Sequence, residues 1–181
     1  TTLNLTNDDI WNGGVTIEDA VSSGTFEVGS AVINQCTIVI NNIYDKFTKY
    51  DFKEAVVSVQ LGIDLNETEF DIDADDETES SYTPRIEKIK KGVYTVDDTK
   101  YNGSITTLTC IDNMGKFDRA YSESKLEYPA TLKAIVMDAC DICGVTLNTP
   151  DFSHSDYIIN TRPTDAAVTF REVIAWCGQI S

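Results

Sequence analysis

Apolar side chains recur at every second position in several stretches between residues 36 and 110, and this two-residue period predicts β-strands. The alternation is clear over residues 36–41, where Cys36, Ile38 and Ile40 are separated by more polar neighbours. It returns over residues 56–61 and is expected to stop at Gly62. Strands with two unlike faces are typical of an antiparallel sheet that covers a core on one side.

A third and a fourth strand are expected on either side of an Asn-Gly pair. Residues 92–96 lead through Asp97 and Asp98 to Asn102-Gly103, and alternation resumes over residues 105–110. Both positions of an Asn-Gly pair tolerate a positive φ, so the pair predicts a tight hairpin turn.

The pattern changes to a helical one near residue 128. From Thr131, apolar residues recur at steps of three and four up to Cys143, and Gly144 follows where a helix C-cap belongs. Thr169 and Glu172 have the spacing of a capping box, which predicts a second helix with Phe170, Val173, Ile174 and Cys177 on its apolar face. Short strands are expected at 145–147 and 157–159.

These patterns predict an α+β fold that is mainly β. We expect a β domain over residues 1–120 and a small α/β domain with two helices over residues 126–181. The chain begins with Thr1 rather than Met and stops directly after a helical pattern, so we expect it to be a piece of a longer protein.

The charge excludes several classes of partner. The chain has 14 Lys and Arg against 30 Asp and Glu, a net charge of −16. Such a surface repels a phosphate backbone and an anionic membrane, so DNA-binding and membrane-surface functions are disfavoured, and no apolar run is long enough to span a bilayer. An acidic wall would instead suit a duct through which DNA slides.

Nine of the acidic residues lie in the stretch 64–82, which predicts a solvated loop. Within it, Asp71, Asp73 and Asp75 have the spacing that opens a calcium-binding loop. The sixth position should be Gly and is Asp76, and the twelfth should be Glu and is Tyr82, which excludes an EF-hand. Loose binding of a divalent ion by the clustered carboxylates stays open.

The cysteines point to packing rather than chemistry. There are five, an odd number with no framework spacing, so we expect them to be reduced, as in a protein made in the cytoplasm. Cys140 and Cys143 form a C-x-x-C pair at the C-terminal end of the predicted helix, where the dipole does not favour a thiolate. A zinc site would need a second close pair, and Cys177 and His154 stand alone. Core packing is the favoured interpretation.

No catalytic, cofactor or metal site is predicted. His154, the single histidine, is expected in a surface loop, and no nucleophile motif accompanies it. Trp11 and Trp176 are interpreted as packing anchors. The cluster of Tyr44, Phe47, Tyr50 and Phe52 suits either a packed loop or an aromatic platform for sugars. We therefore expect that the chain is not an enzyme.

A succession of short motifs carries a resemblance to a known family. They are Trp11-Asn12-Gly13-Gly14, Phe26-Glu27-Val28-Gly29, Tyr50-Asp51-Phe52, Gly92-Val93-Tyr94, Leu108-Thr109-Cys110 and Tyr128-Pro129-Ala130. In this order they resemble the N-terminal region of phage tail baseplate hub proteins, including those of Mu-like contractile tails and of defective prophages. The acidic stretch 64–82 is an expanded loop relative to the family pattern.

The resemblance implies both a fold and a role. The first domain would be a tail-tube-like β-barrel or sandwich that assembles side by side into a ring. Three chains with two such domains each would join the sixfold tail tube to a threefold spike or tip, and DNA would pass without specific binding. The residues after 126 would begin the element between the two domains, and the second tube-like domain would lie beyond Ser181. The chain would then be a homotrimeric component of the virion tail, made in the bacterial cytoplasm.

Two other classes stay open at this point. One is a surface module that binds carbohydrate or calcium. The other is the non-catalytic N-terminal part of a tail-associated peptidoglycan hydrolase.

Overall fold

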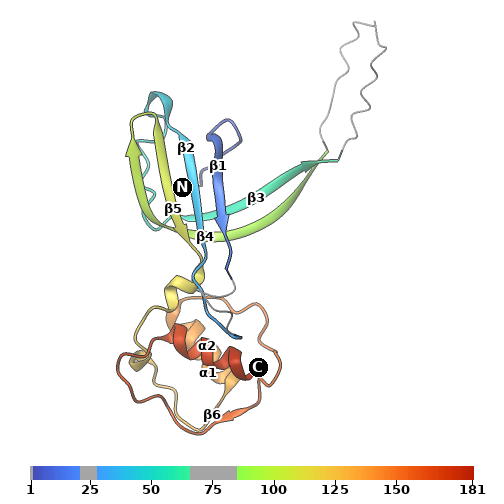
Figure 1. The fold of residues 1–181 in the computed structure, drawn as a ribbon, viewed down its shortest axis with the longest axis vertical. Helices are drawn as coiled ribbons and strands as arrows, with labels where there is room; N and C mark the ends of the chain where they lie inside the picture. The colour runs from blue at the N-terminus through green and yellow to red at the C-terminus, as the bar shows by residue number, and fades with distance from the viewer. Residues whose placement is uncertain (1, 21–27, 66–84) are drawn as a thin grey trace, which may run out of the picture.

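A computed structural model describes residues 2–20, 28–65 and 85–181 of the chain. Strands hold 36% of the described residues and helices 22%, so the expected α+β, mainly β class is confirmed. Figure 1 shows a curled sheet at one end of the molecule and a helical unit at the other. The calcium-type run at 71–76 and most of the acidic stretch lie outside the described residues.

The sheet has five antiparallel strands in the order β1-β2-β5-β4-β3. In chain order they are β1 (Ile10–Glu18), β2 (Gln35–Asn41), β3 (Val56–Asp64), β4 (Ile86–Asn102) and β5 (Ile105–Ile111). In the described part of the chain β1 and β3 each pair with one strand only, so they form the two edges of the sheet.

The alternation of β2 and β5 is confirmed by their register. Cys36 lies opposite Cys110 and Ile38 opposite Leu108, and all four side chains are buried. Phe47 and Phe52, from the segment between β2 and β3, complete this core together with β4 residues. The period-two pattern therefore marks the face of the sheet that this segment covers.

Two expectations for the β3–β4 hairpin are wrong. β3 does not stop at Gly62 but continues to Asp64, and β4 begins at Ile86, six residues before Gly92. Glycine weakens a strand without ending it, and here the cross-strand partner Lys88 holds Gly62 in the ladder. The 17-residue β4 absorbs two irregularities in pairing, next to Val59 and next to Val96, which bend it.

The predicted hairpin turn is confirmed with its position shifted by one residue. Asn102 pairs with Ile105, so the two-residue loop is Gly103-Ser104 rather than Asn102-Gly103. Gly103 has a φ of +57° and nothing within 4 Å of the place where a Cβ would stand. A glycine at the first position of a two-residue hairpin loop suits the sharp reversal of the chain.

The second unit packs two helices around its own core. α1 (Leu132–Cys143) ends at the predicted left-handed Gly144, and α2 (Phe170–Ile180) begins with the predicted Thr169–Glu172 capping box. The N-cap of α1 is Thr131, whose hydroxyl accepts a hydrogen bond from the Ala134 amide. β6 (Ala130–Thr131) pairs with β7 (Ile158–Ile159), which confirms the strand expected near 157–159. The strand expected at 145–147 is wrong, because these residues follow the α1 cap without a partner strand.

The buried residues fall into two clusters along the chain. One cluster lies within residues 36–110, and the other lies within residues 117–177. Phe117 and Tyr121, from the short 3-10 helices after β5, pack with the helices rather than with the sheet. The division into domains at 120 and 126 stays a prediction. The boundary between the two buried clusters lies slightly earlier, between Cys110 and Phe117.

Residues 28–34 join the two units by lying against α2. Gly29 approaches α2 so closely that a Cβ there would stand 2.5 Å from the amide nitrogen of Gln179. Arg171 of α2 contacts the Ala31 carbonyl at 3.4 Å and forms an ion pair with Asp118. The segment that leads into β2 therefore contacts α2 at both of its ends.

Asp9, just before β1, bonds to the end of β2 and to the segment that follows it. Its carboxylate accepts hydrogen bonds from the Thr6 amide at 3.1 Å and from the Thr6 hydroxyl, and it forms an ion pair with Lys46. The Asp9 carbonyl also accepts from the Asn41 amide at 2.8 Å. The hydrogen bond from Lys46 is the main reason why the pKa of Asp9 is lowered.

We expect Asp9→Asn to lower the free energy of unfolding by about 1 kcal/mol at pH 7. A lowered pKa in the folded state means that the carboxylate stabilises the fold above about pH 4 and that this contribution is lost as the pH falls further. Urea denaturation from pH 7 to about pH 2 should show the gap between variant and wild type closing. Asp8→Asn, at an exposed neighbour, is the control, and a gap that is constant with pH would contradict the assignment.

Candidate functional site

The C-x-x-C pair lies inside the helical core. Cys140 and Cys143 are buried near the C-terminal end of α1, and burial is the main cause that raises the pKa of each thiol. Burial also raises the pKa of Cys177, in the same cluster, to about 11. Thiols held in this neutral form are poor nucleophiles and poor metal ligands, which supports the packing interpretation.

The remaining cysteines lie opposite each other in the sheet. Cys36 and Cys110 are fully buried and unbridged, and burial raises the pKa of Cys110 to about 12. In the described part of the chain no group of three or more His, Cys, Asp or Glu residues is placed to hold a metal ion.

His154 occupies an exposed turn, as predicted. It has a φ of +53°, and its carbonyl accepts a hydrogen bond from the Tyr157 amide at 2.8 Å. In the part of the chain that the structure describes, its side chain forms no hydrogen bond or ion pair and belongs to no group of potential metal ligands. The expected absence of an enzymatic function stays a prediction.

The aromatic cluster is a packed loop with one exception. Phe47 and Phe52 are buried, and Tyr50 lies between them with ring centroids 6.4 and 6.2 Å away. Tyr44 does not join them: it is 97% exposed and has a left-handed φ of +61°. A single exposed ring does not form an aromatic platform for a sugar, but Tyr44 is a large aromatic side chain exposed to solvent.

The interpretation of the two tryptophans as packing anchors is wrong. Trp11 is 44% exposed and Trp176 is 42% exposed, and neither belongs to a buried cluster. Trp11 lies at the start of the edge strand β1, and Trp176 lies on α2 at the rim of a groove described below. Partly exposed tryptophan is characteristic of surfaces that bind other proteins.

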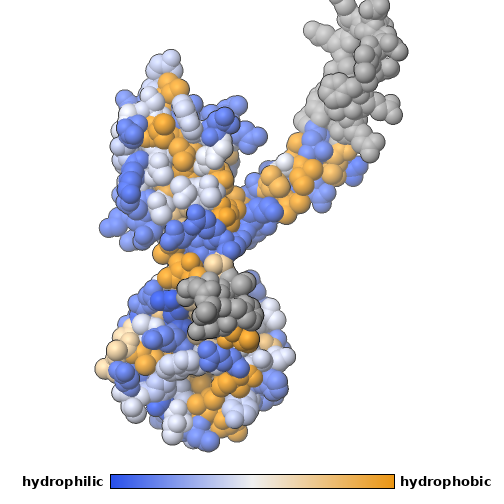
Figure 2. Space-filling view, viewed as in Figure 1, coloured by the Kyte–Doolittle hydropathy of each residue, from blue (hydrophilic) through white to orange (hydrophobic). Residues whose placement is uncertain are grey.

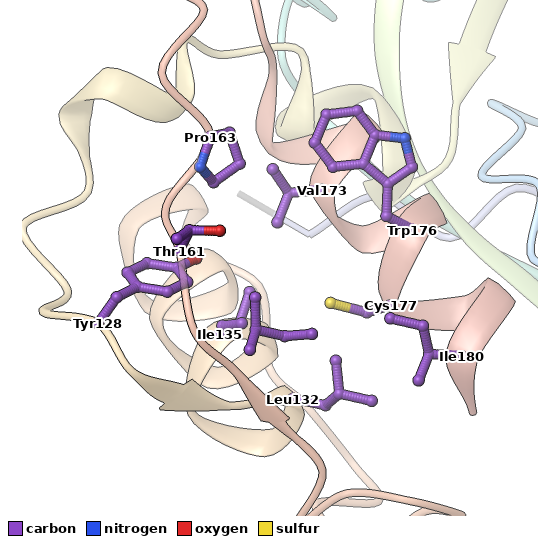
Figure 3. A pocket seen from close by; sticks show the side chains of 10 residues that line it. Tyr128, Leu132, Ile135, Thr161, Pro163, Val173, Trp176, Cys177 and Ile180 are labelled. Carbon is purple, nitrogen blue, oxygen red and sulfur yellow. The ribbon is translucent and has the colours of Figure 1, made fainter.

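Trp176 borders a small apolar groove of the helical unit (Figure 3). The groove has a volume of about 140 Å³ and lies between α1, α2 and residues 159–163. Figure 3 shows Leu132, Cys177 and Ile180 lining it, and the labelled residues with a hydroxyl group are Thr161 and Tyr128. Ligand sites usually have several hundred Å³ and a set of convergent polar groups, so the groove does not fit a small-molecule site.

The outer half of the β3–β4 hairpin is the most unusual surface of the molecule. We call residues 60–65 and 85–91 the arm; Figure 1 shows it extending away from the other strands. Apart from the half-buried Asp64, every residue of the arm is exposed. A two-stranded ribbon that has no other layer packed on it is marginally stable in water, and none of the other described elements covers the arm.

The two faces of the arm differ in chemistry. Leu61 pairs with Ile89, and Ile63 and Leu65 follow on the same face at every second position. The exposed fractions of these four apolar side chains are between 39% and 46%, and the exposed Glu87, the partner of Ile63, lies on the same face. The opposite face carries Gln60 with Lys90, Gly62 with Lys88, and Asp64 with Ile86. Figure 2 shows apolar and hydrophilic residues side by side along the arm.

A second exposed apolar surface lies at the opposite edge of the sheet. We call Trp11, Ile43 and Tyr44, with the acidic residues Asp8 and Asp45, the β1-end patch. The hydrogen bond from the Asn41 amide to the Asp9 carbonyl and the Asp9–Lys46 ion pair bring these two stretches together. All five members of the patch are exposed.

Sequence reasoning missed the two surfaces for different reasons. Leu61, Ile63 and Leu65 do alternate with other residues, but the strand was expected to end at Gly62, so Ile63 and Leu65 were not counted as part of it. The exposure of Trp11 and Tyr44 has no sequence signal, because burial of a lone aromatic residue depends on which segment covers it.

Neither of the two described α-helices has the length and apolar composition needed to cross a lipid bilayer. No family model, curated protein or solved structure matches the chain. The resemblance to baseplate hubs therefore depends on the ordered motifs of the sequence alone.

Proposed function

We propose that the chain is a structural subunit of a phage or prophage-derived tail baseplate hub, part of the ring that joins the tail tube to the spike and lets DNA pass. The observation that supports this best is the incomplete sheet. Its two edges, β1 and β3, lack a second partner strand in the described part of the chain, and each edge region exposes apolar side chains. Such a sheet is suited to being completed by neighbouring subunits.

The chemistry of the described residues agrees with a structural role. The five thiols are buried, and the groove that Trp176 borders is small and apolar. The net charge of −16 agrees with a lumen through which DNA passes without adhering. As a hub, the protein would act with copies of itself and with the tube and spike proteins.

Immunogold electron microscopy tests the proposal. Prophage induction of the strain that encodes the chain should release tails or tail-like particles, and an antibody against this chain should place gold at their distal end. Gold along the whole tail would indicate a tube protein instead. Intact tails without gold, with label on the cell surface, would contradict the hub proposal and favour a surface-binding module.

A further inference from the structure

We infer that Cys36 and Cys110 form a reversible disulfide bond under oxidising conditions, which joins the two neighbouring strands β2 and β5 inside the sheet. The inference does not depend on the hub proposal, because it concerns the sheet of a single chain. It rests on the register of the two strands, on the spacing of paired residues in an antiparallel ladder, and on the burial of both thiols.

The two cysteines form a hydrogen-bonded pair of the β2–β5 ladder. They lie directly opposite each other in the antiparallel register. At the end of this ladder the Asp112 amide donates a hydrogen bond to the Asn34 carbonyl at 3.0 Å. Hydrogen-bonded pairs recur at every second position of an antiparallel ladder, so Cys36 and Cys110, two residues further in, are such a pair.

This position determines the distance that a disulfide has to span. The Cα atoms of a hydrogen-bonded pair are about 5.5 Å apart, which lies within the range of about 4.4–6.8 Å found across disulfides. Their Cβ atoms are also about 5.5 Å apart, whereas a relaxed disulfide joins Cβ atoms about 3.8 Å apart. Both side chains lie on the same face of the sheet, so the bond can form, but it has to draw the two strands together locally. A disulfide strained in this way is reduced more easily than a relaxed one.

Burial controls when the bond forms. Both side chains are fully buried, and burial is the main cause that raises the pKa of each thiol. Because the thiolate is the form that attacks a disulfide, the closed sheet reacts slowly with an oxidant. We therefore expect the pair to be oxidised while the sheet forms or when it opens transiently.

The reaction is a thiol–disulfide exchange with a small disulfide such as oxidised glutathione. The thiolate of one cysteine attacks that disulfide and releases one molecule of reduced glutathione. The thiolate of the other cysteine then attacks the mixed disulfide and releases a second molecule. The two thiols lose two electrons and two protons in total, and the two released glutathione molecules carry them. A reducing compartment would keep the strained pair as thiols, and an oxidising one would close it and prevent the two strands from separating.

Refolding of the full chain in glutathione buffers tests the inference. The chain is unfolded in urea with a reductant and refolded at about pH 8 over a series of ratios of oxidised to reduced glutathione. Free thiols are then alkylated, and the linked peptides are identified by mass spectrometry. In excess oxidised glutathione, more than about half of the protein should contain the Cys36–Cys110 link and keep the circular dichroism spectrum of the reduced form. In excess reduced glutathione the link should be absent.

Two single variants separate this pair from the other cysteines. Cys36→Ala removes the link, and Cys177→Ala is the matched control, because each variant deletes one buried thiol. Cys177→Ala should form the link as the wild type does. Cys36→Ala should leave Cys110 free or joined to glutathione. The peptides of the wild-type chain give the answer even where a variant folds poorly.

Three results would overturn the inference. One is a chain that keeps Cys36 and Cys110 as free thiols in excess oxidised glutathione, or that links only Cys140, Cys143 or Cys177. Another is a link found only in protein that has lost its native circular dichroism spectrum, because the bond would then belong to the unfolded chain. The third is a link that persists after refolding in excess reduced glutathione, since such a bond is not reversible. The gold-labelling experiment tests the hub proposal separately, so the two can fail independently.

Discussion

Phe170→Ala should lower the free energy of unfolding by about 3–5 kcal/mol, a large part of the stability of a unit of this size. The Phe170 side chain is fully buried at the start of α2. Its ring meets the Tyr121 ring edge-on, with centroids 5.1 Å apart and an interplanar angle of 74°. Removing it leaves a cavity next to Tyr121, which the surrounding helices cannot fill without shifting.

Urea denaturation followed by circular dichroism measures this loss. Ile180→Ala is the matched control on the same helix: its side chain is 38% exposed, and we expect a loss of about 1 kcal/mol or less. Trp176 fluorescence reports on the helical unit, and Trp11 fluorescence reports on the sheet. Equal losses in the two variants would show that Phe170 is not a central residue of the helical core.

Gly29→Ala should be the second most damaging change, at about 2–4 kcal/mol. Gly29 has a φ of +75°, a conformation that disfavours any side chain. An added Cβ would also stand 2.5 Å from the Gln179 amide nitrogen and 2.9 Å from the Ala175 carbonyl oxygen. These are backbone atoms of α2, so no side-chain rotation relieves the clash. The segment 28–34 would have to move away from α2.

Gly13→Ala separates the two causes. Gly13 has a φ of +68°, close to that of Gly29, but nothing lies within 4 Å of its Cβ position. We therefore expect only the conformational cost there, about 1–2 kcal/mol. Thermal unfolding of both variants gives the difference, which is the contribution of close packing against α2. Equal losses would contradict the contact between this segment and α2.

The sequence predicts the elements whose signals are local. The α1 and α2 ends follow from Thr131, Gly144 and the Thr169–Glu172 box, because a cap uses only neighbouring backbone groups. The period-two pattern of β2 likewise identifies its buried face. Such signals need no knowledge of the rest of the chain.

The errors other than the one-residue shift of the hairpin loop concern which distant segment pairs with or covers a residue. Trp11 and Trp176 are exposed, β3 passes through Gly62, and residues 145–147 lack the partner strand that their β-favouring side chains would accept. Each depends on a segment distant in sequence. The exposed apolar surfaces were missed because a sequence does not show which apolar residues remain uncovered by the rest of the subunit.

The strand order has a consequence for the order of events during synthesis. β2 ends at Asn41, but its inner partner β5 ends only at Ile111, so the centre of the sheet cannot close until that residue has left the ribosome. At about 5–20 residues per second this interval is roughly 4–14 s, and the apolar row of the arm is made within it. Charged residues beside an apolar strand oppose aggregation, so Lys88 and Lys90, on the opposite face, would reduce contacts between nascent chains before each sheet is complete.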